Sequence, residues 1–270
     1  MYKYYSRHKI SEEGEFSFKP SDYSKFKYGD DQIAEQFGKS LAQGFIEEQL
    51  SKCNKMPQLV VVSSPYAFIP TATFAMKNYF VFELNRWLAA NDFPVLQEIK
   101  IHRTTTYKAD YGQLTATERL KLIGNDKFYM DKHFLENKTL IILDDIKITG
   151  THEVMIKRTL EQHQIQNAAY FLYFAELINP SIHPNIENYL NNYTIKTIND
   201  LEELLRFDRF SINTRIVKFM LNTDTKDFQN FIKNQNNSFC NLLYDMAIGN
   251  EYHKMKAYND NLKWLSTNLV

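Results

Sequence analysis

The stretch TLIILDDIKITGTHE, residues 139–153, decides the fold of this chain. Its opening residues are mostly apolar and predict a buried strand over 139–143. Two adjacent aspartates, Asp144 and Asp145, follow that strand, and a Thr-Gly pair precedes a predicted helix over about 151–164. In an open parallel sheet, ligands collect at the carboxyl ends of the strands. The stretch therefore predicts a binding site made of two carboxylates and the first turn of a helix.

The chemistry of this stretch favours a sugar phosphate as the ligand. Adjacent carboxylates repel each other, but they accept hydrogen bonds from sugar hydroxyls and tolerate a nearby cation such as Mg²⁺. The unpaired amides at a helix start suit a phosphate. The alternative is that Asp144 and Asp145 only cap the next element. The combination of strand, two acids, Thr-Gly and helix favours the ligand site.

The rest of the chain predicts an α/β fold, in which a parallel sheet is flanked by helices and followed by a helical lobe. Strands alternate with helices from residue 30 to residue 199, which is typical of a parallel sheet with right-handed crossovers. Besides 139–143, strands are predicted at 58–62, 95–101, 168–177 and 194–198. Helices are predicted at 30–49, 74–90 and 184–191.

The pattern divides the chain into three predicted parts. Residues 1–29 form an N-terminal edge or hood segment, and the alternation at 15–18 suggests an edge hairpin within it. Residues 30–199 form the α/β domain. Residues 200–270 follow helical spacing throughout and form a lobe that either covers the site end of the sheet or makes the contact of a homodimer.

Composition excludes several classes of protein. Lys+Arg and Asp+Glu balance at 32 each, so we expect no general nucleic-acid binding. The first ten residues lack the apolar core of a signal peptide, and the longest apolar run is too short to span a bilayer. Two cysteines without metal-type spacing suggest a reducing compartment. We therefore expect a cytoplasmic protein with no membrane partner.

The central motif resembles that of a known family. The segment LIILDDIKITGTH resembles the phosphoribosyl-pyrophosphate (PRPP) motif of type I phosphoribosyltransferases. The segments KYGD at 27–30 and QLTATER at 113–119 are similar to parts of the ComF-like branch. The resemblance covers about residues 25–200. It implies a type I phosphoribosyltransferase-like fold and a place in nucleotide metabolism.

The resemblance also implies the roles of individual residues. Asp144 and Asp145 would be the catalytic acids, which bind the ribose 2′- and 3′-hydroxyls and hold Mg²⁺ mostly indirectly. The residues implied around the 5-phosphate are Ile148, Thr149, Gly150, Thr151 and His152. The loop implied to hold the pyrophosphate contains Ser63, Ser64, Pro65 and Tyr66. A flexible loop that closes over the reacting centre would include Arg103, Lys108 and Arg119.

Three positions depart from the family pattern. The family usually has a small or hydroxylated residue where Ile148 stands, an apolar residue where Lys147 stands, and Ser or Thr where His152 stands. These changes remove side-chain hydroxyls and leave the backbone amides. Binding of PRPP through the backbone is therefore still expected.

The implied function is a Mg²⁺-dependent phosphoribosyltransferase, an enzyme that moves phosphoribose from PRPP to a nitrogenous base or a similar acceptor. Two alternatives stay open at the level of sequence. One is a non-catalytic regulator that binds PRPP or a nucleotide. The other is a sugar-phosphate enzyme of unrelated type with the same strand-end geometry.

Overall fold

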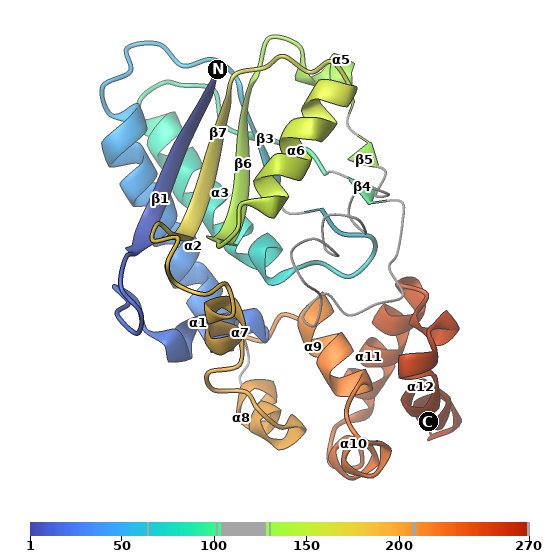
Figure 1. Ribbon diagram of the computed structural model, residues 1–270. Helices are drawn as coiled ribbons and strands as arrows, with labels where there is room; N and C mark the ends of the chain where they lie inside the picture. The colour runs from blue at the N-terminus through green and yellow to red at the C-terminus, as the bar shows by residue number, and fades with distance from the viewer. Residues whose placement is uncertain (64, 101, 104–127, 130, 207–208, 269–270) are drawn as a thin grey trace.

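The computed structural model describes residues 1–63, 65–100, 102–103, 128–129, 131–206 and 209–268. Its main sheet has five strands in the order β1-β7-β6-β2-β3 (Figure 1), and every neighbouring pair runs parallel. The strands are β1 (Tyr2–Ile10), β2 (Leu59–Ser63), β3 (Gln97–Glu98), β6 (Thr139–Lys147) and β7 (Ala169–Leu177). The predicted α/β class with a parallel sheet is confirmed.

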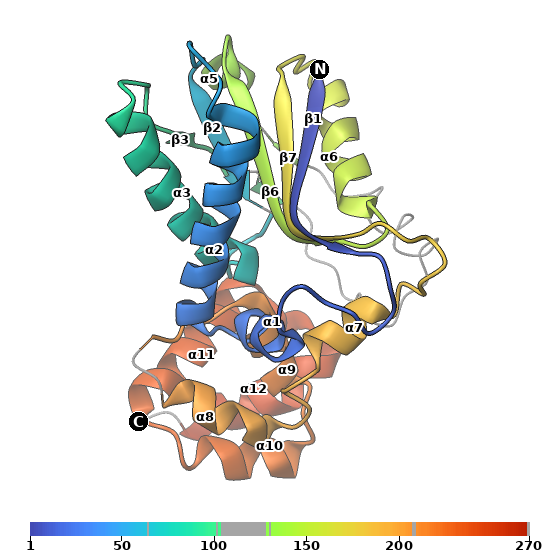
Figure 2. The same ribbon diagram turned by 90° about the vertical axis from the view of Figure 1, so that its left-hand side faces the viewer.

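Helices cover both faces of the sheet, as Figure 2 shows. On one face lie α2 (Asp31–Phe45) and α3 (Ala72–Ala90), and on the other lies α6 (Thr151–Gln162). The central strand β6 is buried along its length except at Lys147. Its side chains alternate between the two faces, because successive residues of a strand point in opposite directions. Ile141 and Leu143 join the core beneath α2 and α3, while Leu140 and Ile142 join the core beneath α6.

Beyond the carboxyl edge of the sheet lies a set of helices with its own core. Two short helices, α1 (Pro20–Lys27) and α7 (Ile186–Asn191), lie at that edge. The predicted lobe is helical and comprises α8 (Leu201–Leu205), α9 (Thr214–Leu221), α10 (Thr225–Ile232), α11 (Asn237–Gly249), the 3-10 turn η4 (Tyr252–Lys254) and α12 (Lys256–Asn268). Its core also takes in Tyr28 and Ile69 from the sheet domain. The lobe is thus packed against the carboxyl side of the sheet domain, and the boundaries at 29 and 199 stay predictions.

The structure differs from the sequence prediction at several elements. The N-terminal segment contains no hairpin at 15–18; instead β1 runs parallel to β7 at the edge of the sheet. The predicted strand at 194–198 is not formed, because Ile195 and Ile198 turn into the lobe core and a 3-10 turn, η3 (Ile198–Asp200), follows. The strand predicted at 95–101 is reduced to β3.

The remaining elements are short. A π-helical turn, η1 (Ile46–Leu50), continues α2, and α5 (Lys132–Leu135) precedes β6. A separate antiparallel pair joins β4 (His102–Arg103) to β5 (Phe128–Tyr129), and the chain between these two strands lies outside the described residues. Among the residues that the structure describes, none of the helices combines the length and apolar character needed to cross a membrane.

Candidate functional site

Asp144 and Asp145 lie near the carboxyl end of β6, within the strand. The strand continues two residues beyond them, because Ile146 and Lys147 still pair with β7. The other neighbour, β2, ends earlier, where Ser63 pairs with Leu143. The two acids therefore extend past the end of β2, which is where a parallel sheet leaves room for a ligand. The predicted end of this strand at residue 143 is four residues too early, and the two carboxylates point to opposite faces.

The Asp145 carboxylate is buried and held by three donors from two helices. One oxygen, Oδ2, accepts a hydrogen bond from the Tyr23 hydroxyl at 2.6 Å and forms an ion pair with the Lys27 ammonium. The other oxygen, Oδ1, accepts a bond from the Thr73 hydroxyl at 3.1 Å. Tyr23 and Lys27 stand one turn apart on α1 and so reach the same carboxylate.

The electrostatics of Asp145 follow from these contacts. Burial by itself raises the pKa of this carboxyl, but the charge of Lys27 and the hydrogen bonds from Lys27 and Tyr23 outweigh it. The pKa is therefore held well below its usual range, and Asp145 is ionised at neutral pH. Burial and the adjacent carboxylate both raise the pKa of the Tyr23 hydroxyl, which keeps it a donor.

Asp144 faces α6 and pairs with His152. Its Oδ1 accepts a hydrogen bond from the Asp145 amide at 3.0 Å, and its Oδ2 lies 3.0 Å from His152 Nδ1. The histidine side chain is 67% exposed at the start of α6. Desolvation by itself lowers the pKa of His152. The hydrogen bond to Asp144 and the negative charge of that carboxylate outweigh this effect and raise the pKa above its usual value.

The predicted phosphate loop has the backbone shape that an anion site needs. Gly150 is the N-cap residue of α6 and has a left-handed backbone, with φ at 70°. No side chain of the described residues caps this helix start, and its first backbone bond runs from the Val154 amide to the Gly150 carbonyl. The hydroxyls of Thr149 and Thr151 lie 2.8 Å apart beside it. Uncapped amides and two hydroxyls thus gather at the start of a twelve-residue helix.

Besides His152, which pairs with Asp144, the other two departures from the family pattern also have structural roles here. Ile148 packs against the core beneath α2 and α3, so it supports the loop from below. The ammonium of Lys147 lies 2.9 Å from Glu153 on α6 and 3.0 Å from Glu176 on β7. The Tyr173 hydroxyl also donates to Glu153, at 2.9 Å. Lys147 therefore ties the loop to both of its neighbouring elements.

The predicted pyrophosphate loop begins at the end of β2, directly beside the two acids. Pro65 and Tyr66 are described, and Ser64 lies outside the described residues. The Lys100 ammonium stands 3.9 Å above the Tyr66 ring and donates a hydrogen bond to the Ala67 carbonyl at 2.9 Å. Burial lowers the pKa of Lys100. This lysine was not among the predicted site residues, because nothing in the sequence links it to a loop more than thirty residues earlier.

Of the residues predicted for the flexible loop, only Arg103 is among the described residues. Arg103 lies in β4, which pairs with β5 outside the main sheet, while Lys108 and Arg119 lie outside the described residues. The segment QLTATER also lies there. The closing-loop interpretation of these residues therefore stays a prediction.

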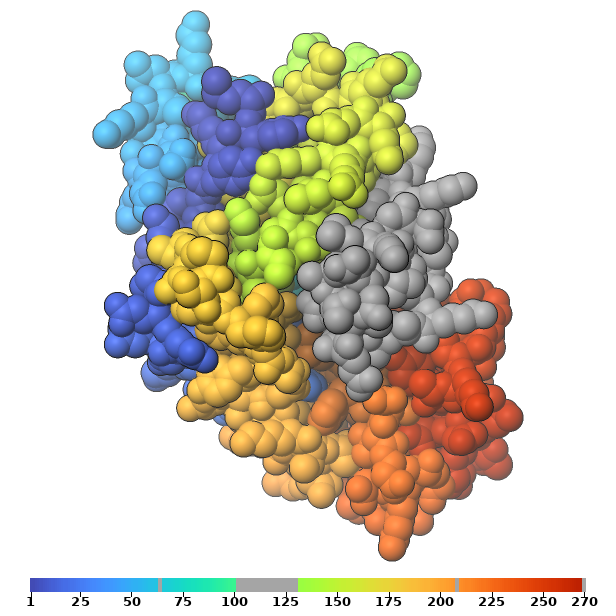
Figure 3. Space-filling view, viewed as in Figure 1, coloured from blue at the N-terminus to red at the C-terminus, as the bar shows by residue number. Residues whose placement is uncertain are grey.

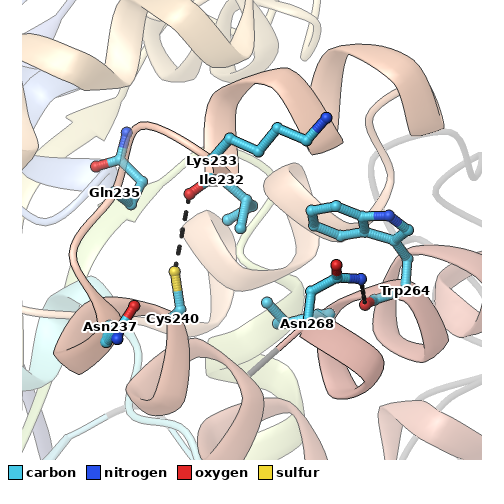
Figure 4. A pocket seen from close by; sticks show the side chains of 8 residues that line it. Ile232, Lys233, Gln235, Asn237, Cys240, Trp264 and Asn268 are labelled. Carbon is cyan, nitrogen blue, oxygen red and sulfur yellow. Dashed lines mark hydrogen bonds between the residues drawn. The ribbon is translucent and has the colours of Figure 1, made fainter. Parts of the chain in front are cut away.

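A separate hollow lies within the lobe, between α10, α11 and α12 (Figure 4). Cys240 and Trp264 line it. The Cys240 thiol points to the Ile232 carbonyl at 3.9 Å, and burial raises its pKa, so it is not poised as a nucleophile. The Asn268 amide bonds to the Trp264 carbonyl at 2.8 Å. These polar groups are used within the lobe, and the acids of β6 remain the better candidate site.

Comparison with known proteins identifies the type of fold and family. A family model described as ComF-like phosphoribosyltransferase matches residues 1–265. The match includes the lobe, so the span of 25–200 taken from the sequence motifs was too short. No curated protein sequence matches the chain.

The solved structures with similarity include purine phosphoribosyltransferases. One is a hypoxanthine phosphoribosyltransferase from Staphylococcus aureus, with 14% identity, a TM-score of 0.32, and coverage of 63% of this chain and 80% of that one. Another is the Trypanosoma cruzi hypoxanthine phosphoribosyltransferase in complex with IMP, with 13% identity, a TM-score of 0.33, and coverage of 55% and 78%.

Proposed function

The chain belongs to the ComF-like phosphoribosyltransferase family, and from this we propose that it is a Mg²⁺-dependent enzyme that transfers phosphoribose from PRPP to a nitrogenous base or a similar acceptor, releasing pyrophosphate. The proposal rests on the order of the features along β6 and the start of α6. Two carboxylates lie near the end of a buried strand, and five residues after Asp145 a left-handed glycine opens an uncapped helix. Family membership sets aside the alternative of an unrelated sugar-phosphate enzyme.

The ribose would bind at the two acids. Asp145 has three donors among the described residues, and a carboxylate offers about four acceptor positions, so a sugar hydroxyl can still donate to it. Asp144 presents its carboxylate on the other side of the strand, toward the helix start where the 5-phosphate would sit. The ribose of PRPP would thus lie at the two acids and its 5-phosphate at the start of α6, in agreement with the covalent order of these groups.

The transfer itself needs the pyrophosphate to leave with its bonding electrons. The bond from ribose C1 to the pyrophosphate oxygen breaks, a bond from C1 to the acceptor nitrogen forms, and the centre between them is oxocarbenium-like. The loop that contains Pro65 and Tyr66 would hold the departing group. Lys100 would add a positive charge beside that loop, where negative charge develops.

The donor set fits a magnesium ion that arrives with the substrate. Among the described residues, no group of three or more His, Cys, Asp or Glu side chains is placed to hold a metal ion. Mg²⁺ typically keeps several waters and is shared between substrate phosphates and one or two carboxylates. Asp144 and Asp145 would be those carboxylates, mostly through water, and the ion would neutralise the departing pyrophosphate.

A second candidate is a regulator that binds PRPP or a nucleotide without turnover. It is favoured by the fact that both acids already have protein partners, Lys27 for Asp145 and His152 for Asp144. The test is pyrophosphate release from PRPP and Mg²⁺ across a panel of bases, with calorimetry of PRPP binding in parallel. Release with one or more bases supports the enzyme, and binding without release supports the regulator. Failure to bind PRPP contradicts the enzyme and the PRPP-binding regulator, and leaves only a regulator that binds a nucleotide.

Gly150 provides a specific test of the phosphate loop. We expect Gly150→Ala to lower PRPP affinity and to lower the free energy of unfolding by about 1–2 kcal/mol, because a side chain is strained at a φ of 70°. Space is not the reason, since the added carbon would meet only the Lys147 side chain, at 3.5 Å.

The matched control is Gly14→Ala. Gly14 also has a positive φ, at 81°, and an added carbon there would meet nothing within 4 Å. It lies in the turn after β1, and β7 separates β1 from β6 in the sheet. Urea unfolding should show a similar loss for both variants, and calorimetry should show weaker PRPP binding only for Gly150→Ala. Equal PRPP affinity in the two variants would show that the backbone of Gly150 does not serve the phosphate.

The other predictions from the sequence stay predictions. The cytoplasmic location rests on composition, the homodimer on the apolar faces of the helices at 200–270, and the part in nucleotide metabolism on the resemblance. Analytical ultracentrifugation of the full chain tests the homodimer directly.

A further inference from the structure

The chain that follows the pyrophosphate loop is held by the lobe. Residues 67–71 connect Tyr66 to α3 and have no regular secondary structure. Ile69 in this connection is completely buried and belongs to the lobe core. Gly249 at the end of α11 lies so close to Phe68 that an added carbon would stand 2.3 Å from its ring. In Figure 3 the orange and red lobe lies directly below the sheet domain.

The contact is made by hydrogen bonds to the backbone of the connection. The side-chain oxygen of Asn250 accepts bonds from the amides of Phe68 and Ile69, at 3.0 and 3.1 Å. Thr214 donates its hydroxyl to the Ile69 carbonyl at 2.8 Å and its amide to the Pro70 carbonyl at 2.9 Å. Backbone groups of three consecutive residues are therefore satisfied by the lobe, because the connection has no helix or strand to satisfy them.

Asn250 is well placed to act as a fixed support. It is buried, with 6% of its surface exposed, and its amide nitrogen donates to the Tyr252 hydroxyl at 2.9 Å. This second bond orients the carboxamide so that its oxygen faces the two amides. On the other side of the loop, Lys100 holds the Ala67 carbonyl. The connection is thus held by Lys100 at Ala67 and by the lobe at the next three residues.

We propose that Asn250 is a positioning residue that sets the path of the pyrophosphate loop, so that the lobe determines affinity for the pyrophosphate group of the substrate. The inference rests on the proposed function, since it assumes that PRPP binds at this loop. The carboxylates and helix amides of the ribose and 5-phosphate sites belong to β6 and α6, and none of the bonds to residues 68–70 described above involves them. The lobe should therefore affect binding of PRPP and not binding of ribose 5-phosphate, which lacks the pyrophosphate.

The test measures both ligands by calorimetry, with Mg²⁺, on the full chain. We expect Asn250→Leu to weaken PRPP binding about tenfold, since two backbone amides lose their acceptor. Binding of ribose 5-phosphate should stay within about twofold of the wild type. Asn250→Asp keeps the acceptor and should restore most of the PRPP affinity.

Asn261→Leu is the matched control. Asn261 is also a buried asparagine of the lobe, and its amide donates to the carbonyls of Leu221 and Thr223, at 3.0 and 2.8 Å. It makes these bonds within the lobe. Asn261→Leu should therefore destabilise the lobe in a similar way and leave the ratio of the two affinities unchanged.

Several outcomes would overturn the inference. The first is an unchanged PRPP affinity in Asn250→Leu. The second is an equal loss of affinity for PRPP and for ribose 5-phosphate in that variant. The third is a changed ratio of these two affinities in Asn261→Leu. If Asn250→Leu does not fold, Thr214→Val removes only a hydroxyl donor to the same connection, and the same comparison applies to it. A wild-type protein that does not bind PRPP would overturn the proposed function itself, which is a distinct result.

Discussion

Replacing Lys27 by methionine should lower the free energy of unfolding by about 3–5 kcal/mol, because it leaves a buried carboxylate without its partner charge. The side chains of Lys27 and Asp145 are only 13% and 8% exposed, so water cannot take the place of the ammonium. The tyrosine and threonine hydroxyls that also contact Asp145 would remain, but neither of them carries a charge. Urea unfolding followed by circular dichroism measures the loss.

The matched control is Lys39→Met. Lys39 pairs with Glu35 one turn away on α2, and these side chains are 40% and 25% exposed. A pair that water reaches contributes about 0.5 kcal/mol or less. Similar losses in the free energy of unfolding for Lys27→Met and Lys39→Met would show that the buried Lys27–Asp145 pair contributes no more to stability than an exposed pair.

The effect of Lys27→Met should depend on pH. The pKa of Asp145 is depressed in the folded protein, so its contribution is present above its unfolded pKa of about 4. That contribution is lost as the pH falls through the folded value. The difference in stability between wild type and variant should therefore be full at pH 7 and shrink below about pH 4. A difference that grows on acidification would contradict the assignment.

Replacing Asp144 by asparagine should weaken PRPP binding by about 10- to 100-fold, because hydrogen bonds to a charged group are worth roughly 1.5–3 kcal/mol. Asparagine keeps a side-chain oxygen that can accept from the Asp145 amide, so the strand end should stay intact. Asp144 is the cleaner of the two acids to change, because Asp145 also holds the buried ion pair. Calorimetry with PRPP and Mg²⁺ measures the effect.

Asp92→Asn provides the control for Asp144→Asn. It makes the same change of charge at an exposed position after α3, where the backbone is left-handed and asparagine is well tolerated. PRPP affinity should be unchanged there. If Asp144→Asn also binds PRPP as the wild type does, Asp144 does not hold the ribose.

The local part of the site could be predicted from the sequence, because one strand and one helix contain most of it. The apolar run before Asp144, the Thr-Gly pair and the helix after it are contiguous, and periodicity detects such patterns. The prediction of a strand at 194–198 was wrong, because the spacing of apolar residues does not show which of the hydrophobic cores a residue packs into. Ile195 and Ile198 pack into the lobe, and neither belongs to a strand of the described sheets.

The partners of the site could not be predicted, because they come from distant parts of the chain. The Lys27 ammonium meets a carboxylate 118 residues later, and the Asn250 oxygen meets an amide 182 residues earlier. Periodicity has no information at such separations. Lys147 could be predicted only in part. The sequence shows that it departs from the family motif, but only the structure shows that it pairs with Glu153 and Glu176.

The order of strands has a consequence for how this protein is made. Among the strands that the structure describes, β1 comes first along the chain and its sheet neighbour β7 comes last; Ser6 bonds to Glu176 across 170 residues. At a synthesis rate of about 5–20 residues per second, β1 must wait roughly 10–30 s for that neighbour. During translation β2 can pair with β3 and then with β6 before β7 is made, so β1, which is made before all of them, is the last strand to join the sheet.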